Sequence, residues 1–228
     1  MNKLKSAKTK LGNEICLLGN QKILKQVQND ALSLVIGVFH GDEPQGKFLI
    51  EEYIKIHPEC PLLFIPCLNP DGMQSGTRTN ANGVDLNRNF PTKNWSLSEK
   101  TLTETDKNPC GQAGCGKKNQ FFGGFEPASE IETKFLIDTI EEYKPDTILT
   151  LHAPYKVVNY DGPAKELAQM ISEIMDYPVE ENIGYPTPGS FGTYSGVEKN
   201  IKTITLELDE TCPVEELISP VHRVLNKL

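Results

Sequence analysis

The 228-residue sequence has no surplus of basic residues and no long apolar stretch. Lysine and arginine number 23 against 31 aspartate and glutamate residues, which gives a formal net charge of −8. Such an acidic chain is poorly suited to neutralise phosphates or to bind anionic lipid, so we expect no nucleic-acid partner and no membrane partner. No run is apolar enough to cross a bilayer, and no apolar signal-peptide segment follows the lysine-rich residues 1–11. We therefore expect a cytoplasmic protein.

Cysteine is too sparse and too scattered for a disulfide scaffold. Among the six cysteines, a close pair stands out in the glycine-rich segment Cys110-Gly-Gln-Ala-Gly-Cys115. This pair could close a small disulfide loop or supply half of a metal site, although two thiols fall short of the about four ligands of structural zinc. We expect most of the other cysteines to be buried apolar side chains.

Apolar β-rich runs alternate with segments of helical character. The runs suit strands that are buried on both faces and lie at 32–39, 62–68, 147–151 and 203–208. The helical segments lie at 44–56, 128–143, 163–175 and 213–228. With no internal repeat or low-complexity linker, this alternation predicts one α/β domain over residues 1–228, a doubly wound sheet with helices on both faces.

The span 69–127 has little periodicity and is rich in Gly, Asn, Pro and Thr. A long loop without secondary structure inside a compact domain is usually functional. We therefore expect this span to contribute to a binding site.

Two histidines directly follow predicted core strands. The run 32–39 continues into His40-Gly-Asp-Glu43, and the run 147–151 continues into His152. Ligands bind at the carboxyl edge of open α/β sheets. Each histidine alone could be an ordinary half-buried polar residue. Together with the carboxylate they form a three-ligand zinc set with an open fourth position, so we predict one Zn²⁺ at His40, Glu43 and His152.

Of the other titratable residues, Glu207 fits such a site and two histidines do not. Metal-assisted attack on a carbonyl needs a base, and Glu207 lies near the end of the apolar run 203–208, where an unpaired carboxylate is costly. A structural salt bridge is the alternative role for Glu207. His57 and His222 have no carboxylate at ligand spacing, and we predict that both are surface residues.

The loop span also contains a basic, amide-rich cluster around Arg78, Asn87 and Arg88. Guanidinium groups bind carboxylates in a bidentate manner, so the cluster could hold an anionic group of a substrate. Its Asn-Gly and Asp-Leu-Asn segments are also typical of plain turns, which is the alternative role of the cluster.

Five motifs follow one another along nearly the whole chain: His40-Gly-Asp-Glu43, Arg78, Asn87-Arg88-Asn89-Phe90, His152 and Glu207. Taken in this order, they resemble the motifs of the zinc metallocarboxypeptidase family, the group of carboxypeptidases A and B. The resemblance implies a single mixed, mostly parallel, twisted sheet with helices on both faces, one zinc ion at the predicted ligands, and Glu207 as the catalytic base. It also implies that Arg78 polarises the scissile carbonyl. Asn87 and Arg88 would then hold the terminal carboxylate of a small peptide substrate.

The family also has a mobile tyrosine shortly before a Gly-Ser segment, upstream of the catalytic glutamate. The segment Tyr185-Pro-Thr-Pro-Gly-Ser190 fits this pattern, so we predict a substrate-binding role for Tyr185 rather than for Tyr194. The alternative is a loop aromatic that packs on the neighbouring prolines.

Within the family, the compact length, the His152-Ala-Pro segment and the run 184–193 look most like the murein peptide amidase A branch. This resemblance implies hydrolysis of the γ-D-glutamyl–diaminopimelate bond of cell-wall peptides during recycling in the cytoplasm, with a murein tripeptide as substrate. Asp161 and the loop 190–195 are candidates to bind the second ammonium and carboxylate of diaminopimelate. The Cys110 to Cys115 insertion and the acidic segment Leu208-Asp-Glu210 depart from the branch.

Three other functions remain open at this point. A carboxypeptidase acting on ordinary L-peptides would use the same chemistry. An acylamino-acid deacylase of the aspartoacylase or succinylglutamate desuccinylase type shares the His-x-x-Glu and Asp-Leu-Asn-Arg motifs, although the Asn-Arg-Asn-Phe run and the Tyr185 segment favour the peptidase. A muropeptide-binding protein that keeps zinc without turnover would have no need of Glu207.

Overall fold

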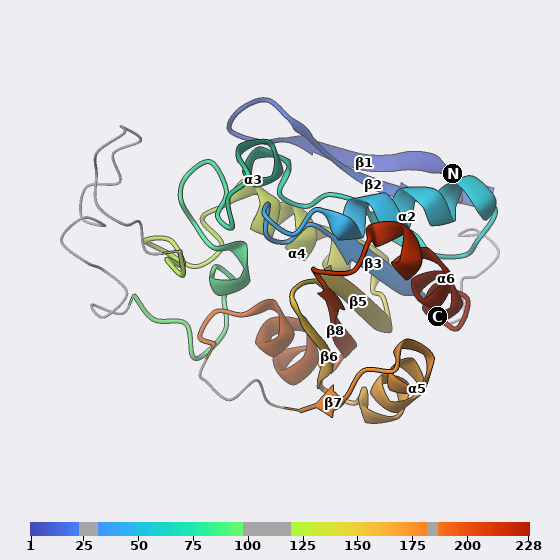
Figure 1. Cartoon of the computed structure of the whole chain (residues 1–228). Helices are drawn as coiled ribbons and strands as arrows, with labels where there is room; N and C mark the ends of the chain where they lie inside the picture. Colours follow the sequence, from blue (N-terminus) through green and yellow to red (C-terminus); the bar gives the residue numbers. More distant parts are fainter. Residues whose placement is uncertain (23–31, 98–119, 182–186) are drawn as a thin grey trace.

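The structure of the protein, a computed structural model, describes residues 1–22, 32–97, 120–181 and 187–228. Within these residues, eight strands form one sheet in the order β1-β2-β4-β3-β5-β8-β6-β7 (Figure 1). The strands are β1 (Asn2–Lys8), β2 (Glu14–Gly19), β3 (Ser33–Gly37), β4 (Leu63–Ile65), β5 (Thr147–His152), β6 (Tyr155–Asp161), β7 (Val179–Glu180) and β8 (Lys202–Asp209). The helices are α2 (Gln45–Ile56), α3 (Pro70–Ser75), the 3₁₀ turn η1 (Leu86–Arg88), α4 (Ile131–Tyr143), α5 (Lys165–Met175), the π-helix η2 (Thr193–Glu198) and α6 (Val214–Leu225).

The centre of the sheet is parallel, and antiparallel pairs join it to both flanks, where β7 pairs parallel with β6. Strands β4, β3, β5 and β8 run in the same direction, whereas β1 with β2, β2 with β4, and β6 with β8 pair antiparallel. All the predicted strands and helices are present, with boundaries that differ by a few residues. The predicted mixed, mostly parallel α/β fold is therefore confirmed.

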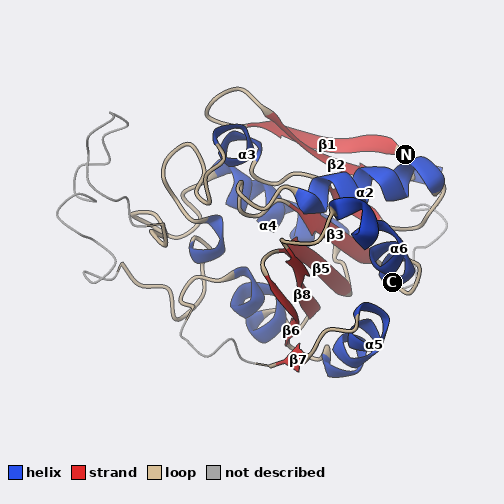
Figure 2. Ribbon diagram, in the orientation of Figure 1, coloured by secondary structure: helices blue, strands red, loops and turns tan. Residues whose placement is uncertain are grey.

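Helices cover both faces of the sheet, as Figure 2 shows. Alternate residues of a strand point to opposite faces, so neighbours in β3 belong to different cores. Val35 packs with residues of α2, α5 and α6. Leu34 and Ile36 pack on the other face with residues of α4 and with Tyr194 of η2. The continuous apolar runs in the sequence reflect this burial on two sides.

The strands that the sequence did not predict lie at the two edges of the sheet. The outer strand β1 carries Lys3, Lys5 and Lys8, and charge on an exposed edge discourages pairing with another chain. In β6, exposed residues come before buried ones, so no apolar run marks the strand. The formation of these edge strands depends on their pairing with neighbouring strands of the sheet, which the local sequence does not reveal.

Some predictions need correction. His222 is not a surface residue: it is buried in α6, its ring meets that of Tyr53 edge-on at 5.1 Å, and its Nε2 lies 3.4 Å from the carbonyl oxygen of Leu49. Among the cysteines at 16, 60, 67 and 212, all free, only the one at 67 is buried. Cys110 and Cys115 lie outside the described residues.

The span 69–127 is less irregular than predicted, because its described part contains α3 and η1. It reaches the carboxyl edge of the parallel strands, where His40 follows β3 and His152 ends β5. Glu207 in β8 pairs directly with His152. None of the described helices is both long and apolar enough to cross a membrane.

Candidate active site

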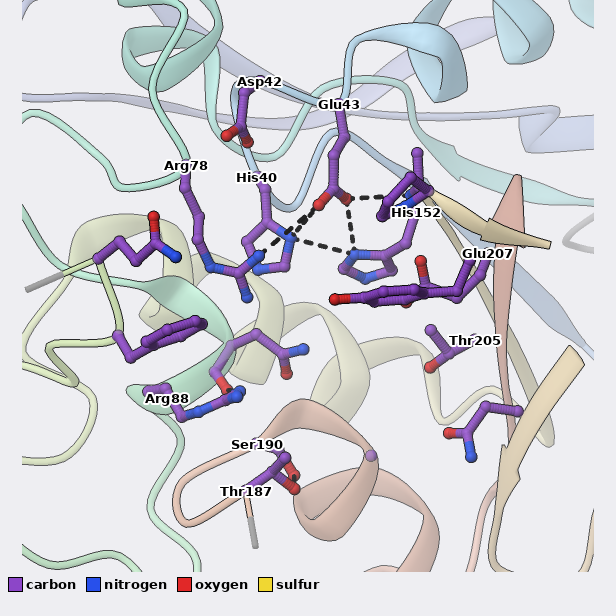
Figure 3. Close-up of a pocket in the computed structure, with 18 of the residues that line it drawn as sticks. His40, Asp42, Glu43, Arg78, Arg88, His152, Thr187, Ser190, Thr205 and Glu207 are labelled. Carbon is purple, nitrogen blue, oxygen red and sulfur yellow. Dashed lines mark hydrogen bonds and ion pairs between the residues drawn. The ribbon is translucent and has the colours of Figure 1, made fainter. Parts of the chain in front are cut away.

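His40, Glu43 and His152 direct their polar atoms to one point, as Figure 3 shows. The Nδ1 atom of His40 lies 2.9 Å from Oε1 of Glu43, and the Nδ1 atom of His152 lies 3.0 Å from Oε2 of the same carboxylate. The two Nδ1 atoms are 3.3 Å apart. The structure therefore brings together all three predicted metal ligands.

A strained turn positions His40. The chain leaves β3 through Val38, which has a positive φ of 52°, an unfavourable conformation for a β-branched residue. The next turn packs directly on α3, since a Cβ atom on Gly41 would lie 2.0 Å from the carbonyl carbon of Gly72. Only glycine fits there, which explains the second residue of the His-Gly-Asp-Glu motif. Glu43 follows at once, just before α2.

Two contacts position His152. The ring of Phe39 stacks on its imidazole with the centroids 5.4 Å apart. The backbone N–H of the next residue, Ala153, donates a hydrogen bond to Oε2 of Glu43 at 3.3 Å, which ties the chain after His152 to the same carboxylate. Only 3% of His40 and 4% of His152 are exposed, so close packing restricts the motion of both rings.

The donor set fits a zinc ion. Two imidazole nitrogens and one carboxylate are typical catalytic zinc ligands. A tetrahedral ion with ligands at about 2.0–2.1 Å separates those ligands by roughly 3.3 Å. The observed spacings of 2.9, 3.0 and 3.3 Å are close to this value. The ligands need to move only slightly to accept the ion.

Charge around the cluster also suits a cation. Burial alone would lower the pKa of His40, but the carboxylates of Glu43 and Asp85 outweigh it and raise the pKa to about 9. Burial would raise the pKa of Glu43, yet His40 and His152 hold it well below its usual range. Positive charge between these groups is therefore strongly favoured.

Asp85 is a further functional candidate, although its Asp-Leu-Asn segment is also typical of a plain turn. Its Oδ1 lies 3.3 Å from Nε2 of His40, on the side of the ring that faces away from the ligand cluster, and its Oδ2 accepts a hydrogen bond from Nε of Arg78 at 3.0 Å. Asp85 is completely buried. A carboxylate behind a ligating histidine orients the ring and increases its basicity. The feature of the sequence that could have identified Asp85 as a functional residue is its place in the Asp-Leu-Asn-Arg run.

Arg78 lies beside the cluster. Its Nη1 atom is 3.7 Å from Oε1 of Glu43, and the guanidinium lies 5.2 Å from the centre of the Phe121 ring. Asp85 fixes the other side of the guanidinium. Arg78 can therefore present N–H donors to an oxygen atom bound near the ligand cluster.

Glu207 faces the same cavity from β8 (Figure 3). Its Oε2 is buried and makes no hydrogen bond to any described residue. Burial raises the pKa of Glu207, and the nearby Glu43 adds to this effect, while His152 and His40 oppose it. A carboxylate with a raised pKa, directed into a cavity, is suited to accept and return a proton. No described group forms the structural salt bridge that was the alternative.

Asn87 and Arg88 form a second polar cluster in η1. The Oδ1 atom of Asn87 accepts a hydrogen bond from the backbone of Phe191 at 2.8 Å, so its amide N–H₂ group is left for the cavity. Arg88 is only 8% exposed, and within the described parts of the chain no carboxylate forms an ion pair with it. A buried arginine without an anion partner indicates an anion-binding site.

These groups line one cavity of about 600 Å³. Asn87, Arg78 and Arg88 contribute to it together with the metal ligands and Glu207, and Asp161, Thr187 and Ser190 complete other parts of the wall. Tyr185 lies outside the described residues, so its predicted role stays a prediction.

The sequence matches the family described as zinc carboxypeptidase over residues 34–169. Murein peptide amidase A of Escherichia coli K12 is 36% identical over 178 residues, which cover 76% of this chain and 69% of that protein. The Vibrio campbellii protein of the same name is 34% identical, with coverages of 80% and 71%.

The fold has solved counterparts. The murein-tripeptide amidase of Escherichia coli O157 superimposes with a TM-score of 0.74 at 26% identity, covering 96% of this chain and 88% of that chain. Carboxypeptidase A from Helicoverpa armigera superimposes with a TM-score of 0.75 over 99% of this chain and 67% of that chain; at 16% identity, it supports the fold alone.

Proposed function

Because the chain belongs to the zinc carboxypeptidase family and is a metallopeptidase, we propose that it hydrolyses the γ-D-glutamyl–diaminopimelate bond of murein peptides. The observation that carries this proposal is the combination, in one cavity, of a zinc-ligand cluster, an unpaired base and a buried unpaired arginine. The names of the relatives support the murein substrate. An ordinary L-peptide remains the alternative substrate.

Zinc, when bound by His40, Glu43 and His152, supplies a Lewis acid for the attacked carbonyl group. The raised pKa of Glu207 suits it to take a proton from the attacking water and to pass that proton to the leaving amine. Arg78 donates N–H groups to the carbonyl oxygen as negative charge develops there.

Asn87 and Arg88 bind the free carboxylate of the released residue. The amide and guanidinium groups come from one short turn, so they hold the carboxylate in a defined position relative to Glu207. Binding energy gained at this remote end orients the bond that is cut. This arrangement restricts the enzyme to substrates with a free carboxylate beside the scissile bond. We place Tyr185 in the same role, as the family resemblance implies.

Mass spectrometry of L-alanyl-γ-D-glutamyl-diaminopimelate, incubated with the zinc-loaded protein, tests the proposal. A panel of L-peptides and a panel of N-acyl amino acids are run in parallel, and the Glu207→Gln variant controls for contaminating hydrolases. Release of diaminopimelate by the wild type alone supports the proposal. Cleavage of L-peptides alone rejects the murein substrate, and hydrolysis confined to N-acyl amino acids identifies a deacylase. Binding of the tripeptide without cleavage would identify a binding protein.

The cytoplasmic location and the recycling role are further parts of the proposal. Fractionation of cells that express the full-length protein, followed by immunoblotting, tests the location. A deletion strain that accumulates uncleaved tripeptide in its cytoplasm would support the recycling role, whereas an unchanged peptide pool would contradict it.

A further inference from the structure

Asp161, the last residue of β6, is an acidic group in the cavity without an assigned partner. It is partly buried, and its carboxylate forms no hydrogen bond or ion pair with any residue in the described parts of the chain. Burial raises the pKa of Asp161 to about 6, and no neighbouring group opposes this shift. An unpaired carboxylate in this setting costs stability and calls for a ligand of opposite charge.

The sheet register places Asp161 in line with the catalytic base. Strands β6 and β8 are antiparallel, with Asn159 opposite Thr205 and Asp161 opposite Thr203. Because alternate residues share one face, Asn159 and Thr205 lie between Glu207 and Asp161, and both line the cavity. Asp161 lies opposite Thr203, which is four residues from Glu207 on β8. At about 3.3 Å per residue, Thr203 and Glu207 are separated by roughly 13 Å along the strand.

The π-helix η2 closes the space behind Asp161. A Cβ atom on Gly192 would lie 2.1 Å from Oδ2 of Asp161, and a Cβ atom on Gly196 would lie 2.3 Å from its Cβ. The backbone at Gly192 and in η2 therefore packs directly on the aspartate. Any side chain at these two positions would collide with Asp161, whose carboxylate lines the cavity.

The cavity carries charges of both signs. Arg78 and Arg88 bring positive charge from the 69–97 segment, and Asp161 on β6 is one of several carboxylates in the lining, the others being those of Asp42, Glu43, Glu181, Glu207 and Glu210. A ligand that has a carboxylate near the scissile bond and an ammonium group farther along would satisfy both ends.

The length of a diamino acid matches this spacing. The backbone nitrogen and the terminal ammonium of lysine or diaminopimelate are separated by six bonds, about 7 Å when extended. A hydrogen bond of about 3 Å at each end brings the total span to about 13 Å. This is the separation along the strands between Glu207, which acts on the scissile nitrogen, and Asp161.

We propose that Asp161 determines specificity by binding the terminal ammonium of a diamino acid at the released position. This inference deepens the proposed function and rests on its assignment of the cleaved bond to the end of the cavity near Glu207. It accounts for diaminopimelate as a leaving group and predicts that lysine, with the same spacing, is accepted. Neutral residues of equal length would be poor substrates.

Steady-state kinetics on matched peptides test this proposal. The series L-Ala-γ-D-Glu-X, with X as diaminopimelate, lysine, ornithine or norleucine, is compared in the wild type and in Asp161→Asn. We expect the variant to lose roughly 10- to 100-fold in kcat/KM for lysine and diaminopimelate, mainly through KM, and to keep its rate for norleucine. Ornithine, one bond shorter, should fall between lysine and norleucine in the wild type.

Glu181→Gln is the matched control, because Glu181 is an exposed carboxylate in the lining of the same cavity. It should leave the ratio of the lysine to the norleucine rates within about twofold. Equal losses of Asp161→Asn for lysine and norleucine would overturn the proposal, since they would show a purely structural role.

Two further measurements separate this proposal from the proposed function. The same X series is prepared as α-linked L-peptides, so that the lysine preference can be measured even if the γ-linked peptides are not cut. Calorimetric titration of the zinc-loaded protein with free lysine and with norleucine covers the case in which neither series is cut. Tighter binding of lysine that disappears in Asp161→Asn supports the role of Asp161. No preference in either protein refutes it.

Discussion

Replacing Asp161 with asparagine should make the protein more stable at neutral pH. The substitution keeps the shape of the side chain and removes a charge that burial disfavours. Burial raises the pKa of Asp161 from 3.8 to about 6. At about 1.4 kcal/mol per pKa unit, this shift corresponds to about 3 kcal/mol of lost stability when the carboxylate is ionised. Because the cavity is open to solvent, which screens the charge, we expect a gain of about 1–2 kcal/mol.

The gain should depend on pH in a defined direction. The pKa of this acid is higher in the folded state than in the unfolded state, so the folded protein binds the extra proton between about pH 4 and pH 6. The wild type therefore loses stability, relative to the variant, as the pH rises through that window. The difference should be largest at pH 8 and should shrink steadily toward pH 5.

Urea unfolding followed by circular dichroism measures this difference. Both zinc-loaded proteins are compared at pH 8, 7, 6 and 5, so that other titrating groups and the pH dependence of metal binding largely cancel. Glu181→Gln, which removes an exposed carboxylate, should change the free energy of unfolding by less than about 0.5 kcal/mol. An Asp161→Asn variant that is less stable at pH 8, or a difference that does not vary with pH, would show that the Asp161 carboxylate is not destabilised by burial. A stabilised variant that has lost its lysine preference is the behaviour expected of a binding residue.

The remaining predictions concern the groups around the metal-ligand cluster. Glu207→Gln should lower kcat by at least about 100-fold because no other described carboxylate occupies its place, while zinc content measured by atomic absorption stays unchanged; near-normal turnover would remove Glu207 from the mechanism. Arg88→Ala should raise KM for substrates with a free terminal carboxylate by about 10- to 100-fold in steady-state assays, and an unchanged preference for free over amidated ends would contradict its role. Asp85→Asn should weaken zinc binding by about 10- to 100-fold in competition with a chelator, and unaltered affinity would show that Asp85 does not support His40.

Residues next to apolar runs could be placed from the sequence. His40, His152 and Glu207 each follow or end a run of buried residues. Parallel strands in one sheet end at one edge, so any polar residue at such an end must lie near the others. The structure brings these residues together for this reason, and Glu43 joins them because it is three residues from His40. The four main helices could also be predicted, since their apolar faces recur at helical spacing.

Residues whose environment comes from distant segments could not be placed in this way. Asp85 looked like a turn residue, and only the packing of its loop against β3 puts it 3.3 Å from His40. His222 looked exposed, but α6 packs on α2 and buries it against Tyr53.

The fold class and the proximity of the proposed metal ligands and base could be inferred from the sequence alone, because local patterns mark strand ends and the carboxyl ends of parallel strands meet at one edge of the sheet. The surroundings of Asp161, on which its proposed role depends, come only from tertiary packing. Asp161 shares a face with Glu207 only through the antiparallel register of β6 on β8, and the turn of η2 confines it there. Neither that register nor that contact leaves a periodic signal in the chain, since both depend on pairing between segments that are distant in sequence.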